Sequence, residues 1–424
     1  MNFAATPSSK LAPLESLETC YARVRGCTRA LCADLAAEDT VVQTMPEVSP
    51  TKWHLAHTTW FFEQFVLGVR AGYRPVHPDW LYLFNSYYQS VGPMHARPQR
   101  GLLSRPTLAE VLDYRARVDE RMQHQFNVAA DSAFSDLVTL GLNHEQQHQE
   151  LLLTDIKHVF SVNPLEPVFR ETHADTSQDP GPLDFVQGRE GIVDIGADAG
   201  GFSFDNERPR HQALLHPHAI ASRPVTNAEY AEFVRDSGYS TAALWMSDGW
   251  EVVRARGWKR PLYWSEDGAT EFTLGGRREI DPNAPVSHVS FYEADAFARW
   301  AGLRLPTEFE WESLAAAQPD RTGNFLDSGR LHPHAAGRTT GDATARQMFG
   351  DVWEWTSSPY VSYPGFRPLA GSLGEYNGKF MCGQWVLRGG SCATPSDHMR
   401  ASYRNFFGPA DRWQFMGFRL GRDA

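Results

Sequence analysis

The sequence predicts an α+β protein with two domains, a helical N-terminal part and a mixed C-terminal part. Up to about residue 160 the apolar residues recur at helical spacing, which is typical of amphipathic helices. Residues 163–182 are rich in proline and break this pattern, so we expect a linker there. Beyond it, glycine, tryptophan and short strand-like runs dominate. We therefore expect a bundle at 1–165, a linker at 166–182 and a mixed domain at 183–424.

The N-terminal part is expected to be a bundle of antiparallel helices. Ser49 is predicted to be the N-cap of the second helix, because serine is a good N-cap and Pro50 suits the first helical position. The four helices of the bundle are expected at residues 14–37, 53–69, 107–126 and 133–159. In the mixed domain, short helices are expected at residues 227–237, 290–301 and 308–317.

Composition and charge exclude several classes of protein. The net charge is −11 without any block of Lys or Arg, so we do not expect a nucleic-acid partner. No stretch approaches the ~20 apolar residues of a membrane span, and Met1–Lys10 lacks the features of a signal peptide. The five cysteines match no disulfide or metal spacing, which favours a reducing cytoplasm. We expect a cytoplasmic protein with small-molecule partners and take a monomer as the simplest state, although the oligomeric state is left open.

Two histidines four residues apart, His144 and His148, are the strongest chemical signal in the sequence. At this spacing both imidazoles leave one face of a helix, so two ring nitrogens can bind the same metal ion. A second pair, His54 and His57, can meet the first inside a bundle, and one of the two would be the third ligand. Three neutral imidazoles leave three positions of an octahedral ion open. This suits Fe(II) with O₂ as co-substrate, although imidazole also suits zinc and copper.

Two other functions fit part of this pattern. The motif His144-Glu-Gln-Gln-His148 matches the H-E-x-x-H of zinc hydrolases, with Glu145 as general base. The metzincin extension is missing, and Glu166, an acidic candidate downstream, lies between two prolines. In the other alternative, the histidines form a structural zinc site in a non-catalytic module. Such a site needs a fourth ligand, and Asp155 lies about three helical turns from His144, which is too far.

Several long phrases of the sequence resemble the ergothioneine-type sulfoxide synthases. They lie at residues 53–63, 84–88, 144–158, 305–308, 350–355 and 403–407. The resemblance covers nearly the whole chain. It implies a DinB-like four-helix bundle followed by a mixed domain like formylglycine-generating enzyme, of the C-type-lectin-like kind.

The resemblance also implies a reaction. Family members use Fe(II) and O₂ to join a sulfur donor, cysteine or γ-glutamylcysteine, to the imidazole carbon between the nitrogens of hercynine (trimethylhistidine). The product is a sulfoxide. In a similar group, the selenoneine synthases, the donor is a selenosugar, and the sequence leaves the choice of donor open.

Metal and catalytic roles follow from the same resemblance. It selects His57 over His54 as the third metal ligand, beside His144 and His148. Tyr87 and Tyr88 take the place of active-site tyrosines, where a phenol can give a proton or a hydrogen atom to the oxygen co-substrate. The sequence does not say which tyrosine is catalytic, and both can also be read as packing aromatics.

Substrate-binding roles are implied as well. Gln147 is expected to hydrogen-bond the hercynine ring, and Arg97 with Arg100 matches a pair that binds the carboxylates of the donor. The carboxylate and the quaternary ammonium of hercynine are expected to meet an amide and aromatic faces. These are provided by Asn405, Phe406 and Phe407. The arginines can also be read as surface residues, and the phenylalanines as core.

The sequence departs from the family at Met94, in Gly-Pro-Met-His-Ala-Arg-Pro, where an arginine is usual. An anionic amino-acid donor would lose a partner there, whereas a neutral sugar donor would not. Formylglycine-generating activity is not expected, because Cys382 and Cys392 do not form a convincing reactive pair and are more simply read as buried thiols. A second, structural cation in the mixed domain is left open.

Overall fold

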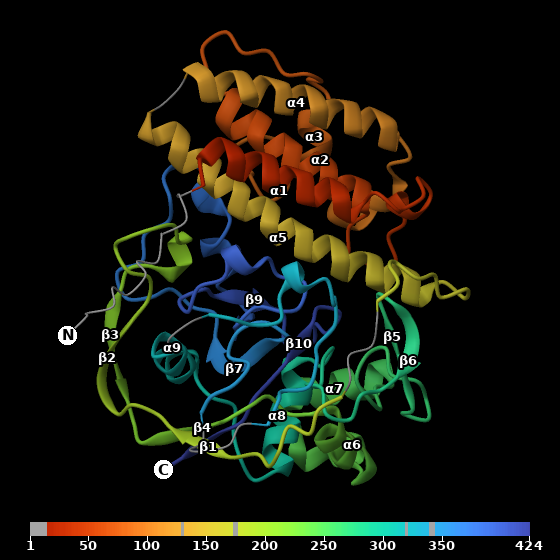
Figure 1. The fold of residues 1–424 in the computed structure, drawn as a ribbon, viewed down its shortest axis with the longest axis vertical. Coiled ribbons are helices and arrows are strands. Elements are labelled where there is room, and N and C mark those ends of the chain that lie inside the picture. Colours follow the sequence, from red (N-terminus) through yellow and green to blue (C-terminus); the bar gives the residue numbers. More distant parts are fainter. Residues whose placement is uncertain (1–14, 129–130, 173–176, 319–320, 339–343) are drawn as a thin grey trace, which may run out of the picture.

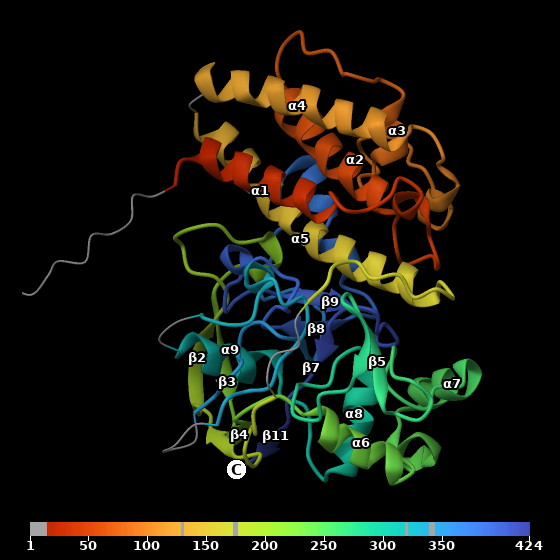
Figure 2. The same cartoon turned by 45° about the vertical axis from the view of Figure 1, so that its right-hand side comes forward.

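The computed structural model describes residues 15–128, 131–172, 177–318, 321–338 and 344–424. A helical part lies above a mixed part in Figure 1, and the long helix α5 runs between them in both views (Figures 1 and 2). This is the α+β class and the domain order that the sequence predicts. We retain the boundaries at 165 and 182 as a proposal. The expectation about a signal peptide concerns Met1–Lys10, which lies outside the described residues.

The helical part is an antiparallel bundle whose helices follow the predicted segments closely. The side chain of Ser16 caps the first helix and the side chain of Asp131 caps the last. The helices are α1 (Leu17–Leu31), α2 (Thr51–Phe61), the short α3 (Trp80–Phe84), α4 (Leu108–Val128) and α5 (Ser132–Val162). After α2 the chain continues as a π-helix over Phe62–Leu67. The bundle surrounds an aromatic-rich core between α2, α4 and α5.

The start of α2 differs from the prediction. The helix begins at Thr51, and Ser49 makes no capping bond. Instead, the backbone N–H of Ser49 donates to a carboxylate oxygen of Asp155 at 2.8 Å, and its hydroxyl accepts a hydrogen bond from Arg100. The serine is therefore used to join the start of α2 to α5 and to Arg100, which overrides its preference for the cap.

The mixed part contains several small sheets in its described residues. In the central one, the strand order is β10-β7-β8-β9, with β7 parallel to β10 and the other pairs antiparallel. Its strands are β7 (Trp353–Pro359), β8 (Trp385–Arg388), β9 (Asn405–Phe407) and β10 (Met416–Gly417). A three-stranded sheet has β1 (Phe185–Gln187), β4 (His218–Ala221) and β11 (Gly421–Asp423). Two hairpins are formed by β2 (Gly191–Ile195) with β3 (His211–Leu215), and by β5 (Thr270–Thr273) with β6 (Gly276–Glu279).

Short helices pack around these sheets. Three coincide with predicted segments and begin with a capping box, in which a Ser or Thr and a Glu three residues later satisfy each other's backbone N–H groups. They are α6 (Asn227–Arg235), α8 (Phe291–Trp300) and α9 (Glu308–Ala316). A further helix, α7 (Ser247–Arg256), was not predicted; it ends at Gly257, which has a left-handed backbone conformation.

Helix α5 joins the two parts through polar and apolar contacts. The buried carboxylate of Glu150 accepts hydrogen bonds from the indole of Trp353 (2.8 Å) and the hydroxyls of Ser391 (2.5 Å) and Thr394 (2.6 Å). Further along α5, Leu152, Leu153 and Ile156 enter an apolar core shared with the mixed domain. These contacts hold α5 in a fixed position against the mixed domain.

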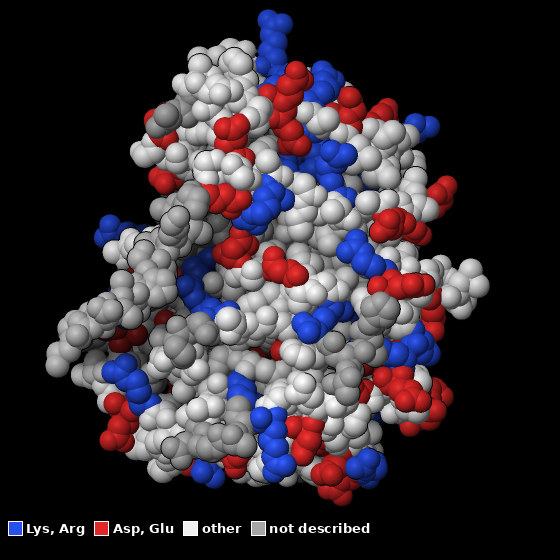
Figure 3. Space-filling model, viewed as in Figure 1, with Lys and Arg blue, Asp and Glu red and all other residues white. Residues whose placement is uncertain are grey.

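The described helices include none that is long and apolar enough to cross a membrane. Figure 3 shows basic and acidic side chains interspersed over one face of the molecule.

Candidate metal centre and substrate cavity

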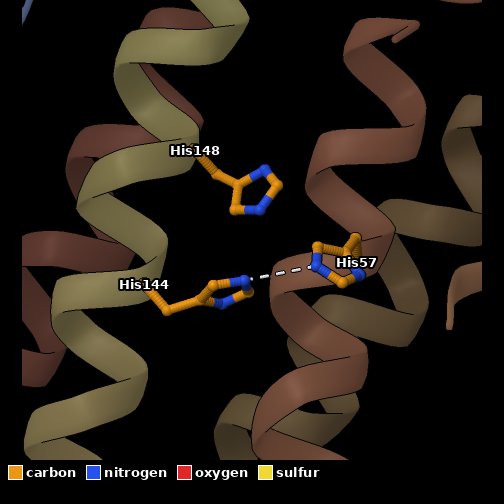
Figure 4. Close-up of side chains that lie close together, drawn as sticks. All are labelled: His57, His144 and His148. Carbon is orange, nitrogen blue, oxygen red and sulfur yellow. Dashed lines mark hydrogen bonds between the residues drawn. The ribbon is translucent and has the colours of Figure 1, made fainter. Parts of the chain in front are cut away.

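Three histidine side chains converge inside the bundle. His57 projects from α2, and His144 and His148 project from successive turns of α5 (Figure 4). Their candidate ligand nitrogens all lie within 4.8 Å of one another, and Nε2 of His57 is 3.3 Å from Nε2 of His144. Ligands at about 2.1 Å from one metal ion and at right angles to each other lie roughly 3 Å apart. The three rings therefore fit a shared metal ion with little movement.

The surroundings keep these histidines in the form that binds metal. Burial in the bundle lowers the pKa of His144 to about 4 and holds the pKa values of His57 and His148 well below their ordinary value. Neighbouring imidazoles act in the same direction on His57 and His148. All three rings are consequently neutral near pH 7, with lone pairs available to a cation.

The second histidine of α2 lies outside this set. The Nδ1 atom of His54 is 2.9 Å from Nδ1 of His148, and its Nε2 atom is 3.1 Å from a carboxylate oxygen of Asp155. The ring of His57 is held differently, since its Nδ1 donates to the carbonyl oxygen of Phe84 at 2.7 Å. Of the two candidates on α2, His57 contributes to the triad and His54 contacts it from outside.

Glu145, the general base of the zinc-hydrolase alternative, faces away from the triad. Its carboxylate is fully buried between Arg25 and Arg115 and accepts a hydrogen bond from Thr28 at 2.6 Å. Although burial alone would raise its pKa, Arg115 and Arg25 lower it to about 2. A carboxylate held in this way cannot accept a proton from a metal-bound water molecule. Glu166 pairs instead with Arg277.

A small cavity adjoins the histidines and contains four of the expected residues. Tyr87, Tyr88, Arg97 and Arg100 all line it together with the triad. Arg97 donates a hydrogen bond to the hydroxyl of Tyr87 at 2.7 Å, and burial raises the pKa of Tyr88. The tyrosine and arginine positions expected from the sequence are therefore brought to the same place as the three histidines.

Arg100 has an unusual environment for a cation. Its side chain is buried, and its guanidinium carbon lies over the ring of Trp53, 3.4 Å from the ring centroid. The guanidinium also donates to the hydroxyls of Ser49 (2.9 Å) and Ser86 (3.0 Å). Burial lowers its pKa to about 9. Among the described residues no carboxylate lies within ion-pair distance of this guanidinium, so the cavity favours an anionic ligand.

A larger cavity opens beside the first, between α5 and the mixed domain. Tyr87, Arg97, Leu151 and Tyr376 line both cavities, so the two adjoin. Polar side chains and seven aromatic rings make up most of the remaining walls. The rings belong to Phe204, Trp353, Phe380, Tyr403, Phe406, Phe407 and Trp413.

The four residues expected to bind hercynine all line this larger cavity, whereas Arg100, expected to bind the donor, lines only the small one. The amide of Gln147 on α5 donates to the hydroxyl of Tyr403 at 2.7 Å. Asn405, Phe406 and Phe407 make up β9, opposite Gln147 across the domain interface. The ring of Phe406 is stacked between those of Tyr360, at 4.1 Å, and Phe380, at 5.8 Å.

The sequence analysis missed several residues of these walls. Tyr376 and Phe380 come from an irregular segment of the mixed domain, and Asp411 follows β9. Burial raises the pKa of Asp411 to about 6. The positions of these three residues depend on the path of loops, which the sequence does not show. For Tyr376 and Phe380, the one hint in the sequence was that residues 376–385 are rich in aromatic side chains.

Other expectations are modified. Met94 is not among the residues that line either cavity. Cys392 is buried as expected, but Cys382 is exposed, because it lies in an irregular loop before β8. Both are free thiols.

Comparisons with known proteins agree with this architecture. A model of the DinB superfamily matches residues 21–153, and a model of the sulfatase-modifying factor enzyme 1-like domain matches residues 174–346 and 340–424. A protein named formylglycine-generating enzyme, from Streptomyces coelicolor, is 31% identical over 53% of this chain and 84% of its own length.

Two relatives extend over nearly the whole chain. A protein named hercynine oxygenase from Mycobacterium tuberculosis is 32% identical over 96% of this chain and 99% of its own length. Another of that name, from Mycolicibacterium thermoresistibile, is 33% identical over 89% of this chain and 88% of its own. At this identity and coverage, the chain belongs to the hercynine oxygenase family and is an enzyme of the ergothioneine-type sulfoxide synthase class.

Proposed function

We propose that this protein uses Fe(II) and O₂ to form a bond between a chalcogen donor and the imidazole carbon between the nitrogens of hercynine. The observation that carries the proposal is that the two cavities adjoin. The cavity lined by His57, His144 and His148 shares four wall residues with the larger cavity at the domain interface. A substrate held in the second can thus reach a metal ion held in the first.

The donor set fits iron. The triad offers three neutral imidazole nitrogens and no carboxylate, and an octahedral ion bound there keeps three further positions. When bound, Fe(II) would supply the activation of O₂ and the oxidation of the two substrates. Everything else in the reaction requires the protein to bind, orient and protonate.

Hercynine suits the larger cavity. Gln147 and Tyr403 form a hydrogen-bonded pair that can donate to and accept from an imidazole ring. Phe380, Phe406 and Phe407 are among the aromatic residues that line this cavity, and cation–π attraction to such rings favours a quaternary ammonium. The amide of Asn405 lies on the same strand as Phe406 and is available to the carboxylate.

The donor is proposed to bind nearer the metal, where Arg100 and Arg97 line the small cavity. The unpaired charge of Arg100 favours a thiolate, a selenolate or a carboxylate. Two carboxylates, Glu47 and Asp411, line the larger cavity close to Arg97. They can accept hydrogen bonds from a polyhydroxylated donor, but would repel a second carboxylate. Both a sulfur donor and a selenosugar thus remain within the proposal.

Tyrosines are the proposed proton donors. The phenol of Tyr87 is oriented by its hydrogen bond from Arg97, and Tyr88 lines the small cavity beside the triad. Tyr376 lines both cavities and lies 6.0 Å from Tyr87, measured between ring centroids. Burial raises the pKa of Tyr88 and Tyr376, so both phenols are protonated near pH 7, as general acid catalysis requires.

The proposal is tested by reconstituting the protein with Fe(II) without oxygen. Hercynine, air and one donor at a time (cysteine, γ-glutamylcysteine or a selenosugar) are then added, and the products are identified by mass spectrometry. A hercynyl sulfoxide would assign a sulfur donor, and a product from the selenosugar alone would assign a selenoneine synthase. His144→Gln should abolish either product. Unchanged hercynine with every donor would refute the proposed reaction.

A further inference from the structure

His148, one of the candidate metal ligands, is held by two further side chains on the side of its ring that faces away from His57 and His144. His148 on α5 contacts His54 on α2 through their Nδ1 atoms, 2.9 Å apart. The other nitrogen of His54 lies 3.1 Å from the carboxylate of Asp155, two turns further along α5. Both His54 and Asp155 are buried, with 2% and 3% of their surface exposed, so bulk water does not compete for these contacts.

The direction of these hydrogen bonds follows from their last member. The two oxygens of Asp155 accept hydrogen bonds from the N–H groups of Ser49 (2.8 Å) and Trp413 (3.0 Å), so we take the carboxylate as the acceptor also toward Nε2 of His54, at 3.1 Å. The Nε2 atom of His54 must then carry a proton. In a neutral imidazole only one nitrogen does so, which leaves Nδ1 of His54 as an acceptor. The proton between the two rings therefore belongs to Nδ1 of His148.

This arrangement fixes the tautomer of His148. With the proton on Nδ1, the lone pair of the ring lies on Nε2, on the other side of the ring, where it can bind metal together with His57 and His144 (Figure 4). His57 reaches the same tautomer by donating from Nδ1 to the carbonyl of Phe84. Nδ1 of His144, by contrast, is buried and has no hydrogen-bond partner among the residues that the structure describes.

We propose that His54 and Asp155 are positioning residues, which hold His148 in the tautomer and orientation that bind the metal ion. They also bring a negative charge within two hydrogen bonds of a centre whose three ligands are all neutral. The inference rests on the proposed function only in that His148 is a metal ligand.

The same chain of contacts crosses the domain interface. Trp413 belongs to the mixed domain, donates to Asp155 and lines the larger cavity. Its ring packs edge-on against that of Phe407, at 5.5 Å, in the proposed hercynine site. The carboxylate that orients the metal ligand is thus itself oriented by a wall of the substrate cavity. Trp413→Phe should weaken metal binding less than Asp155→Asn, because the carboxylate keeps its contacts with His54 and Ser49.

The first experiment reads the tautomer in the metal-free protein. Histidine ring ¹⁵N chemical shifts should show the proton of His148 on Nδ1. In His54→Leu, which removes the acceptor, the Nε2–H form should appear. His54→Asn is the conservative variant, since its amide oxygen can still accept from His148, and it should retain the Nδ1–H form.

The second experiment measures anaerobic Fe(II) affinity. His54→Leu and Asp155→Asn should each raise the Kd for Fe(II) by about 10- to 100-fold, as loss of such outer contacts does in other metal sites. Because both act through one chain of hydrogen bonds, the double variant should lose less than the product of the two single effects. His158→Leu is the matched control. His158 also lies on α5 but bonds Thr44 instead, so its Kd should stay within twofold of wild type.

Several results would overturn the inference. A proton on Nε2 of His148 in the wild type would do so, and so would Kd values within twofold of wild type for both variants. If the Kd for Fe(II) of the double variant rose by the full product of the two single effects, His54 and Asp155 would not act through one chain of hydrogen bonds. Asp155→Asn preserves shape, so it decides the matter if His54→Leu does not fold. A wild type that binds no Fe(II) would refute the proposed metal centre instead, while the ¹⁵N shifts would still test the hydrogen bonds.

Discussion

Replacing Glu145 by alanine should destabilise the bundle strongly while leaving the metal triad in place. The carboxylate is fully buried and pairs with Arg25 at 2.9 Å, with Arg115 at closer range and with the hydroxyl of Thr28 at 2.6 Å. None of these contacts involves the candidate metal ligands. The residue thus contributes to folding although it lies inside the H-E-x-x-H motif.

The expected loss in the free energy of unfolding follows from the hydrogen-bond and ion-pair partners that each arginine keeps in the variant. Arg25 keeps its ion pair with Asp119 at 2.7 Å. Arg115 keeps only neutral partners, the hydroxyls of Thr58 and Thr59 and a backbone carbonyl, and is only 1% exposed. Leaving one buried charge without its counterion costs about 3–5 kcal/mol. For a domain of this size, that corresponds to a fall in Tm of roughly 6–20 °C.

Urea unfolding of the metal-free protein, followed by near-UV circular dichroism, measures the free energy of unfolding of Glu145→Ala against wild type. Glu120→Ala, an exposed position on α4, is the control and should change it by less than about 0.5 kcal/mol. The Fe(II) affinity of the folded variant should stay close to that of wild type. A loss below about 1 kcal/mol would refute the structural role.

Three further predictions concern α5. Gln147→Leu should raise the KM for hercynine roughly tenfold (about 1.4 kcal/mol) in steady-state assays, with a smaller effect on the donor, because it removes the amide that bonds the hydroxyl of Tyr403 and is proposed to bond the substrate ring; an unchanged KM would contradict this. Glu150→Ala should lower the free energy of unfolding by about 3 kcal/mol in urea titrations, since three buried donors lose their acceptor; a change below 1 kcal/mol would be the contrary result. Burial lowers the pKa of Lys157 from 10.5 to about 7. Between these values the unfolded chain holds the proton and the folded chain does not, so the free energy of unfolding should rise with pH by up to about 1.4 kcal/mol per unit. Lys157→Met should flatten that rise, and an equal slope in both proteins would refute the assignment.

The helical half of the fold was largely predictable from the sequence. The helices α1, α4 and α5 have long amphipathic repeats, and their bounds lie within a few residues of the predicted ones except at the ends of α1. Ser49 was misassigned because a tertiary contact with Asp155 competes with capping, and a sequence does not show such partners. Helix α7 was missed although Gly257 marks its end, because Gly249 and Trp250 in its first turn conceal the pattern.

The candidate site was predictable where its residues share a helix, and less so elsewhere. The spacing of His144 and His148 required no knowledge of the fold. Choosing between His54 and His57 required the rotation of α2 against α5, which the family resemblance supplied and the residues alone did not. Residues on loops, such as Tyr376 and Asp411, reach the cavities only through the folding of segments that have no periodic pattern.

The central claim is that hercynine is oxidised at an iron ion held by three histidines. The most direct test follows hercynine by mass spectrometry in matched reactions with the donor that gives product. The protein is loaded with Fe(II), Zn(II) or no metal, under air and under argon. Conversion only with Fe(II) and only in air is the predicted result. Conversion under argon, or equal conversion with Zn(II), would contradict the oxygenase account.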